Sequence, residues 1–240
     1  MAWDQLMAFL KQLEPLLYIV IPFIVGVYIK LSSKVKEQKE TVLKANTAKN
    51  RQTYIDWEHQ ESLKIITRIR DLCNFYKDRG HMDLVNYIQL ENGTLATSKI
   101  CNMFLSCLAE DTRFGDVPKM ISRIQRIPYS RLSCWVDKIM DDPNGTYLES
   151  DTNDVDDCCF RDIMGTDGVR SIVSCAIHDP NGAFIGVCSF FYGGPEWDGR
   201  TEIECRDLMV KFVSAVEGLF LDYHISRRKR RKELNLSEGD

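Results

Sequence analysis

"SIVSCAIHDPNGAFIGVCSFFYGG", Ser171 to Gly194, places two apolar runs on either side of a turn. Within the turn, Pro180 has a fixed φ, and the Asn181-Gly182 pair tolerates the positive φ that a tight reversal needs. Both runs are rich in apolar side chains and poor in charge. The pattern predicts that Ile172–Ile177 and Phe184–Tyr192 are neighbouring antiparallel strands.

A long amphipathic helix follows this hairpin. Thr201 and Glu204 have the spacing of a capping box, in which each residue satisfies a backbone amide of the first turn. We expect a helix over 201–225 that covers the sheet with one apolar stripe, formed by Ile203, Leu208, Met209, Phe212, Val216, Leu219, Phe220 and Tyr223.

The chain before the hairpin contains two further strand candidates, 83–90 and 100–108, and two short helical candidates, 120–124 and 132–140. A polar loop is expected over 141–157. An earlier helix ends near Gly80 and has an apolar face for docking, formed by Leu63, Ile66, Ile69, Leu72, Cys73 and Tyr76. The predicted fold class is α+β, with both terminal helices covering one face of an antiparallel sheet.

The N-terminal region contains the segment "PLLYIVIPFIVGVYIKL" at 15–31, in which Lys30 is the single charge. Seventeen residues are about the lower limit for a helix that crosses a bilayer. A cleavable signal peptide would need a basic n-region and a small-residue cleavage site, which are missing, and a core helix would not suit the polar stretch that follows. We therefore expect residues 1–31 to form a membrane anchor, with contacts from Pro15, Leu16, Leu17, Tyr18, Ile19, Val20, Ile21, Phe23, Ile24, Val25, Val27 and Ile29.

Basic residues are unequally distributed around this anchor. Lys11 is the one basic residue before it, whereas Lys30, Lys34 and Lys36 begin a lysine-rich stretch after it. The positive-inside rule then predicts a single-pass protein of the inner membrane, with its C-terminal domain in the cytoplasm. Residues 32–60 read as a basic helical stalk that can contact anionic lipid. An approximate heptad seam in it predicts self-association, through Leu31, Val35, Val42 and Ala45.

The C-terminal region 226–240 is basic and then acidic. Two interpretations of its basic run stay open: a solvated tail, or contact with anionic lipid or an acidic partner. The residues concerned are Arg227, Arg228, Lys229, Arg230 and Arg231. The formal net charge of −4 gives no general basis for nucleic-acid binding.

The sequence contains no assembled catalytic or metal-binding pattern. Nine cysteines are scattered without zinc-type spacing, which favours buried free thiols in a reducing compartment. His178 borders the hairpin turn, where a local hydrogen bond explains it without catalysis. The acidic run at 151–157 fails as an EF-hand loop, because Asp156 stands where glycine is required. We therefore predict a protein that is not an enzyme and has no metal or cofactor.

Residues 61–225 resemble a GAF/PAS-type sensory domain. The resemblance rests on the strand–turn–strand of 169–192, ending in "GVCSFFY", and on the long helix directly after it. It also rests on "DLVNYIQLENGTLATSKICNMFLSCLAEDTR" at 83–113. This segment is similar to the opening strand pair of GAF-like domains in phage membrane proteins, which typically have His where Glu91 stands.

The T-even-type phage holins are among these phage proteins. The resemblance implies a membrane-anchored sensor or interaction module that binds a protein regulator or a small ligand. The alternative is a phage holin, which forms membrane lesions that time host lysis. Holins of that type keep the globular domain in the periplasm, whereas the lysines after the anchor predict a cytoplasmic domain.

Overall fold

The computed structural model describes residues 2–94, 101–113, 120–154 and 168–236; for 2–29, 92–94, 101, 102 and 154 it describes the backbone alone. The chain divides into two compact units. The first comprises the described residues up to Asp56 together with those from Arg231 onward, and the second is Trp57–Arg230. We call the second the globular unit.

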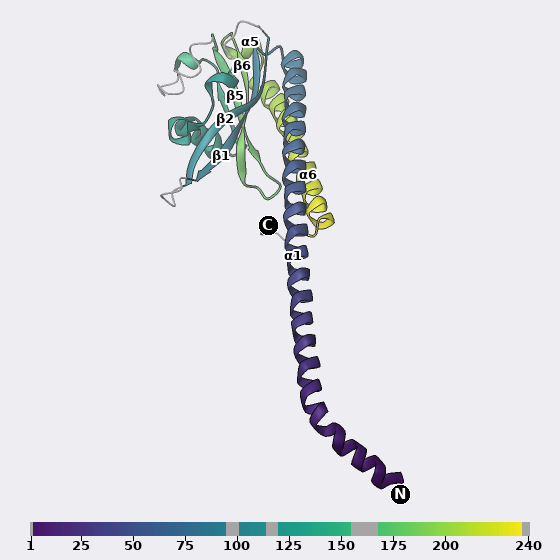
Figure 1. Cartoon of the computed structure of the whole chain (residues 1–240). Helices are drawn as coiled ribbons and strands as arrows, with labels where there is room; N and C mark the ends of the chain where they lie inside the picture. The colour runs from purple at the N-terminus through teal and green to yellow at the C-terminus, as the bar shows by residue number, and fades with distance from the viewer. Residues whose placement is uncertain (1, 95–100, 114–119, 155–167, 237–240) are drawn as a thin grey trace. The chain divides into compact units, whose positions relative to one another are not determined.

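The elements follow one another in an α+β order (Figure 1). In chain order they are α1 (Ala2–Gly80), β1 (Leu84–Thr94), β2 (Cys101–Thr112), α2 (Met120–Arg123), β3 (Ile127–Pro128), the 3₁₀ turn η1 (Tyr129–Arg131), α3 (Ser133–Asp141), β4 (Thr146–Glu149), the 3₁₀ turn η2 (Thr152–Asp154), β5 (Ser171–His178), β6 (Phe184–Tyr192), α5 (Glu196–Gly199) and α6 (Glu202–Glu233). The strands form one six-stranded sheet in the order β3-β2-β1-β6-β5-β4. Every neighbouring pair is antiparallel.

The predicted hairpin is confirmed as the β5–β6 pair, with Ser171 opposite Tyr192 and Ile177 opposite Gly186. In the turn, the Gly182 amide donates to the Asp179 carbonyl at 2.9 Å, and Gly182 has a φ of +81°. The Asn181 amide donates to Asp179 Oδ1 at 2.8 Å. Gly182 therefore supplies the positive φ of the reversal, and Asn181 stabilises it through a hydrogen bond.

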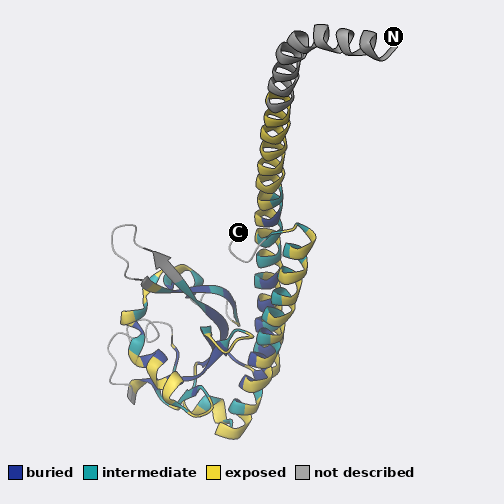
Figure 2. Cartoon of the chain, turned by 90° about the horizontal axis from the view of Figure 1, so that it is seen from below, coloured by how far each residue is buried: buried dark blue, intermediate teal, exposed yellow. Residues whose placement is uncertain are grey.

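Helices α1 and α6 lie side by side and cover one face of the sheet within the globular unit (Figure 2). Their contact with the sheet centres on Phe212, whose ring centroid is 5.2 Å from that of Tyr76 and 5.4 Å from that of Phe190. The predicted cover by both terminal helices is confirmed. The predicted apolar stripes are wrong at two positions, because Leu63 is 52% exposed and Ile203 is 79% exposed.

The opposite face of the sheet is covered by α2 and α3. A second group of buried side chains lies there, including Trp135, Val136 and Ile139 from α3 and Met120 from α2. Both short helices were expected from the sequence, and they begin and end within one residue or so of the predicted ranges.

Two segments differ from the sequence-based expectation. The predicted polar loop 141–157 contains the edge strand β4, which pairs with β5 from Thr146 opposite Cys175 to Glu149 opposite Ile172. Four residues with mixed polarity give too short a pattern to mark a strand.

Helix α6 continues as far as Glu233, through the basic run read as a tail, because Arg and Lys have high helix propensity and neither Gly nor Pro interrupts them.

The N-terminal unit is helical between Ala2 and Asp56. The predicted anchor residues 15–29 lie outside the residues whose side chains are described. Within the residues that are described, no helix is long and apolar enough to cross a membrane. Leu31, Val35 and Val42 of the predicted seam are 58%, 48% and 59% exposed.

A candidate ligand-binding face of the sheet

A row of polar side chains crosses the middle of the sheet from strand to strand. Asn86 of β1 stands opposite Glu110 of β2 on one side and opposite Ser189 of β6 on the other. Ser189 in turn stands opposite Ser174 of β5, which stands opposite Tyr147 of β4. We call these five residues the polar row.

The polar row lies on the face of the sheet that α2 and α3 cover. Side chains alternate between the two faces of a strand, and the residues two positions away from the row belong to the core on this side. They include Leu84 and Ile88 around Asn86, Val187 and Phe191 around Ser189, and Ile172 and Ala176 around Ser174. The row is thus a polar stripe within an apolar face.

Most of the row is fully buried. Asn86, Ser174 and Ser189 have no exposed surface, and Glu110 is 9% exposed. Buried polar groups lower the stability of a fold by about 1–3 kcal/mol each when they lack a hydrogen-bond partner. The hydrogen bonds of the row therefore show which of its polar atoms already have a partner and which could bind a polar group of another molecule.

Three contacts satisfy part of this demand. Ser174 Oγ and Ser189 Oγ are 2.9 Å apart and share one hydrogen bond. The backbone amide of Ile121 donates to Glu110 Oε2 at 2.9 Å, which ties α2 to the row. Asn86 Nδ2 lies 3.2 Å from Met120 Sδ, and a thioether sulfur is a weak acceptor.

Asn86 Oδ1 is buried and has no hydrogen-bond partner among the described residues. It is an unpaired acceptor at the centre of the row, beside a pair of hydroxyl groups that can donate or accept. This arrangement suits a small molecule with an apolar body and a polar edge that carries a donor for Asn86.

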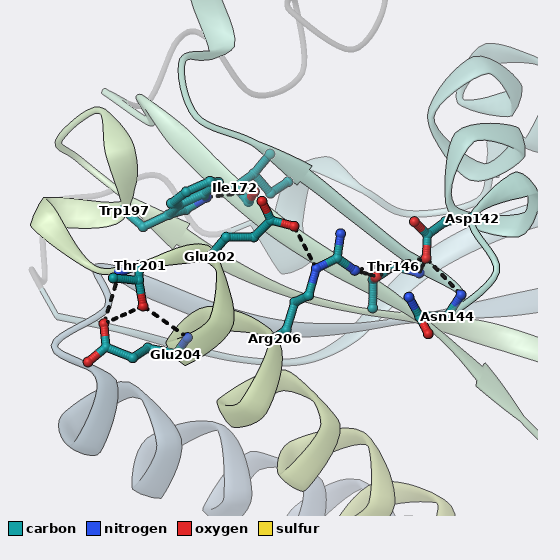
Figure 3. Close-up of polar contacts among 9 residues, drawn as sticks. All are labelled: Asp142, Asn144, Thr146, Ile172, Trp197, Thr201, Glu202, Glu204 and Arg206. Atoms are coloured by element: carbon teal, nitrogen blue, oxygen red, sulfur yellow. Dashed lines mark hydrogen bonds and ion pairs between the residues drawn. The ribbon is translucent and has the colours of Figure 1, made fainter.

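A separate polar cluster joins the start of α6 to β4 (Figure 3). Arg206 Nε donates to Glu202 Oε1 at 2.8 Å, and its Nη1 contacts the Thr146 hydroxyl. The predicted capping box is confirmed at the same helix end, since the Thr201 amide donates to Glu204 Oε2 at 2.9 Å and the Glu204 amide to Thr201 Oγ1 at 3.3 Å. These contacts hold α6 in register on the sheet.

Asp142 organises the turn that leads into β4. Its Oδ1 accepts the Asn144 amide at 2.8 Å and the Thr146 amide at 3.2 Å. Partial burial opposes the charge, but these hydrogen bonds, with help from Arg206, lower the pKa of the Asp142 carboxyl below its usual value. The ionised form of Asp142 therefore stabilises the folded state.

We expect Asp142→Ala to destabilise the chain by about 1 kcal/mol at pH 7, because two backbone amides lose a charged acceptor. A group whose pKa is lowered by folding stabilises the fold above its unfolded pKa, about 3.9, and loses that effect as the pH falls through the folded pKa. The difference from wild type should thus disappear in acid, as measured by urea unfolding from pH 7 to pH 3. The exposed neighbour variant Asp141→Ala should match wild type at every pH, and a pH-independent Asp142 effect would contradict this account.

His178 does not make the local hydrogen bond that its place beside the turn suggested. Its backbone amide donates to Glu217 Oε1 of α6 at 2.9 Å, and its Nδ1 lies 3.7 Å from the same oxygen. His178 therefore ties the hairpin to α6. No group of His, Cys, Asp or Glu side chains in the described part of the chain has the geometry of a metal site.

The predicted lipid- or partner-contact residues are partly exposed and partly engaged. Lys30, Lys34 and Lys36 are exposed, as are Arg228 and Lys229. In contrast, Arg227 Nε lies 3.0 Å from Glu58 Oε1 within the globular unit. In the N-terminal unit, the Arg231 guanidinium lies 5.5 Å from the centroid of the Tyr54 ring. The exposed members of the run are the ones available to a lipid or a partner.

The predicted buried thiols are confirmed at Cys73, Cys107, Cys175, Cys188 and Cys205. Burial raises the pKa of Cys175 to about 12, and burial also holds the thiols of Cys107 and Cys188 in their neutral form by raising their pKa values. Cys134 on α3 is exposed. Cys101, Cys158 and Cys159 lie outside the residues whose side chains are described.

The polar row was missed in the sequence analysis. A signal for it was present, because Ser174 and Ser189 interrupt strands that are otherwise apolar, and Asn86 interrupts another. What the sequence did not show was the pairing of β1 with β6, because the strands β2, β3, β4 and β5 all lie between them in the chain. That pairing alone brings Asn86 beside the two serines.

No family model and no curated protein matches this sequence. Solved structures do match. The blue-light-absorbing form of the PixJ GAF domain from Thermosynechococcus elongatus has a TM-score of 0.51 at 16% identity, over 69% of this chain and 93% of that domain. The cyanobacteriochrome TePixJ GAF domain has a TM-score of 0.50 at 12% identity, over 67% of this chain and 91% of that one.

A structure of the cyanobacteriochrome receptor PixJ, determined in the dark and under illumination, also has a TM-score of 0.50, at 14% identity, over 67% of this chain and 97% of that one. These matches show that the chain has the fold of a GAF domain. They support the GAF-like part of the predicted resemblance and give no support to its phage-holin part.

Proposed function

We propose that this chain is a membrane-anchored sensor module whose GAF-like domain binds a small ligand over the polar row and acts by binding, without catalysis. One observation carries the proposal. Asn86 Oδ1 is an unpaired acceptor, buried beside the Ser174–Ser189 hydroxyl pair, within an apolar face that two short helices cover. Ligand sites combine a mainly apolar surface with a few polar groups that orient the ligand in this way.

The chemistry of the row favours binding over turnover. A serine nucleophile needs an adjacent general base that removes its proton. The neighbour of Ser174 Oγ is instead the hydroxyl of Ser189, whereas His178 Nδ1 lies 3.7 Å from Glu217 Oε1 of α6. The buried thiols described above have raised pKa values, which makes them poor nucleophiles.

The membrane part of the proposal rests on the sequence. The apolar run at 15–31 has the length of a short spanning helix, and the lysines after it set the orientation by the positive-inside rule. We therefore propose that the GAF-like domain faces the cytoplasm. The exposed Leu31, Val35 and Val42 on one helix support self-association through the anchor and stalk.

Ligand binding can be tested through Tm. A small metabolite that raises the Tm of the full-length chain should have much less effect on Asn86→Leu, which keeps the branched shape of the side chain and removes the acceptor. At 100 times its Kd a ligand stabilises the bound fold by about 2.7 kcal/mol, so the shift is measurable. The matched variant Asn153→Leu, at an exposed position of η2, should respond as wild type does. A ligand that stabilises Asn86→Leu as well as wild type does not bind over the row.

Anchoring and orientation need a second experiment. The full chain should stay with membranes after an alkaline wash, and deletion of residues 1–31 should release it. An impermeant thiol reagent should leave the exposed Cys134 unlabelled in sealed spheroplasts and label it after lysis, with Cys134→Ser showing how much labelling that thiol contributes. Labelling in sealed spheroplasts would place the domain in the periplasm and favour the holin alternative. A full-length chain that is soluble without detergent would contradict the anchor.

A further inference from the structure

A pocket lies on the other face of the sheet, beneath α1 and α6. Its volume is about 280 Å³. Apolar side chains form most of its wall, with Ile65 and Ile69 from α1, Leu108 from β2 and Phe220 from α6. All of these residues belong to the globular unit. Binding pockets for drug-sized molecules typically have volumes of about 300–1,000 Å³, so this pocket suits a smaller molecule.

Tyr87 of β1 also lines this pocket and gives it a polar point. Its side chain has no exposed surface, and its hydroxyl has no hydrogen-bond partner among the described residues. Its ring centroid lies 5.9 Å from that of Phe220, which fixes the ring against α6. Burial raises the pKa of Tyr87 well above its usual value, so the hydroxyl stays protonated and can donate as well as accept.

Two charged side chains, Glu58 and Arg227, form an ion pair beside the lining residue Tyr223. Tyr223, another lining residue, donates its hydroxyl to Glu58 Oε1 at 3.1 Å, and Arg227 Nε lies 3.0 Å from the same oxygen. A charged ligand would have to compete for these partners, and an unpaired charge is costly to bury. The lining therefore favours a neutral molecule.

We propose that the pocket beneath α1 and α6 is a second binding site, for a small, neutral, mainly apolar molecule with one hydrogen-bonding group that pairs with the Tyr87 hydroxyl. It is distinct from the polar row, because Asn86 and Tyr87 are consecutive residues of β1 and point to opposite faces of the sheet. A molecule bound here contacts both terminal helices and the sheet at once.

The probe for this site is 6-fluoroindole, which is small, neutral and apolar and has one N–H donor. Its binding to the full-length chain in a mild detergent can be followed by ¹⁹F NMR, and saturable binding is expected. Ser62→Phe should abolish it, because Ser62 lines the pocket and an aromatic side chain would occupy the space. Tyr87→Phe should raise the Kd about fivefold, as the loss of one hydrogen bond would.

Matched variants separate this site from general effects. Thr67→Phe places the same ring at an exposed position of α1, and both Ser62 and Thr67 donate to the carbonyl four residues earlier. Thr67→Phe should bind the probe as wild type does. Partitioning into detergent is equal for all variants. The site would be overturned if Ser62→Phe and Thr67→Phe bound the probe with equal affinity, or if wild type showed no saturable binding. An unchanged Kd of the probe for Tyr87→Phe would overturn the role of the Tyr87 hydroxyl.

Discussion

Gly186→Ala should destabilise the globular unit by about 2–3 kcal/mol, the upper part of the range for side chains added to a packed interior. Gly186 of β6 stands opposite Gln89 of β1. A Cβ atom there would lie 2.3 Å from the carbonyl oxygen of Ile88 and 3.0 Å from Cε2 of Tyr87. The carbonyl group of Ile88 belongs to the backbone of a central strand, and it cannot move without breaking the β1–β6 pairing.

Gly218→Ala is the matched control, because it makes the same chemical change in α6. A Cβ atom at Gly218 would have no neighbour within 4 Å, and alanine favours a helix interior over glycine by about 0.5–1 kcal/mol. Urea unfolding followed by tryptophan fluorescence should thus show a loss for the first variant and a small gain for the second. Equal stability of the two variants would mean that β1 and β6 are not paired as described.

Phe212→Ala should lower the free energy of unfolding by about 3–5 kcal/mol, the usual loss when a buried aromatic ring is removed. Phe212 has no exposed surface and lies between Tyr76 of α1 and Phe190 of β6, so its removal leaves a cavity where three elements meet. Ile203→Ala, on the same helix but 79% exposed, should change the free energy of unfolding by less than about 0.5 kcal/mol.

Phe212→Leu gives an intermediate case, because leucine fills part of the cavity. The order Ile203→Ala, Phe212→Leu, Phe212→Ala should therefore be the order of increasing loss in thermal or urea unfolding. If Phe212→Ala cost no more than Ile203→Ala, the docking of α6 against α1 and the sheet would be wrong.

Local patterns predicted the parts of this fold that are local. The hairpin depends on neighbouring residues, with Gly182 as the position of positive φ, and the Thr201–Glu204 box depends on residues three apart. Both were found as predicted. The apolar stripe of α6 was also mostly right, because a helical period is visible in sequence. Ile203 fails because, at about 100° per residue, it lies on the opposite side of α6 from Phe212.

The candidate site depends on long-range order instead. Asn86 and Ser189 are far apart in the chain, and only the pairing of β1 with β6 makes them neighbours. Strand β4 was read as loop because Thr146–Glu149 is short and polar at both ends. The pocket beneath α1 and α6 forms where these two helices meet the sheet. No period or spacing within one segment of the sequence predicts that contact.

The two edges of the sheet have a consequence for how copies of this chain can meet. One edge strand, β3, consists of Ile127 and Pro128 alone, and the other, β4, has four residues and ends at Glu149. Proline has no amide hydrogen to donate, and short or charged edges offer an added strand few hydrogen bonds. These two edge strands therefore offer a strand from another copy few hydrogen bonds, so we expect contacts between copies to involve helices rather than β3 or β4.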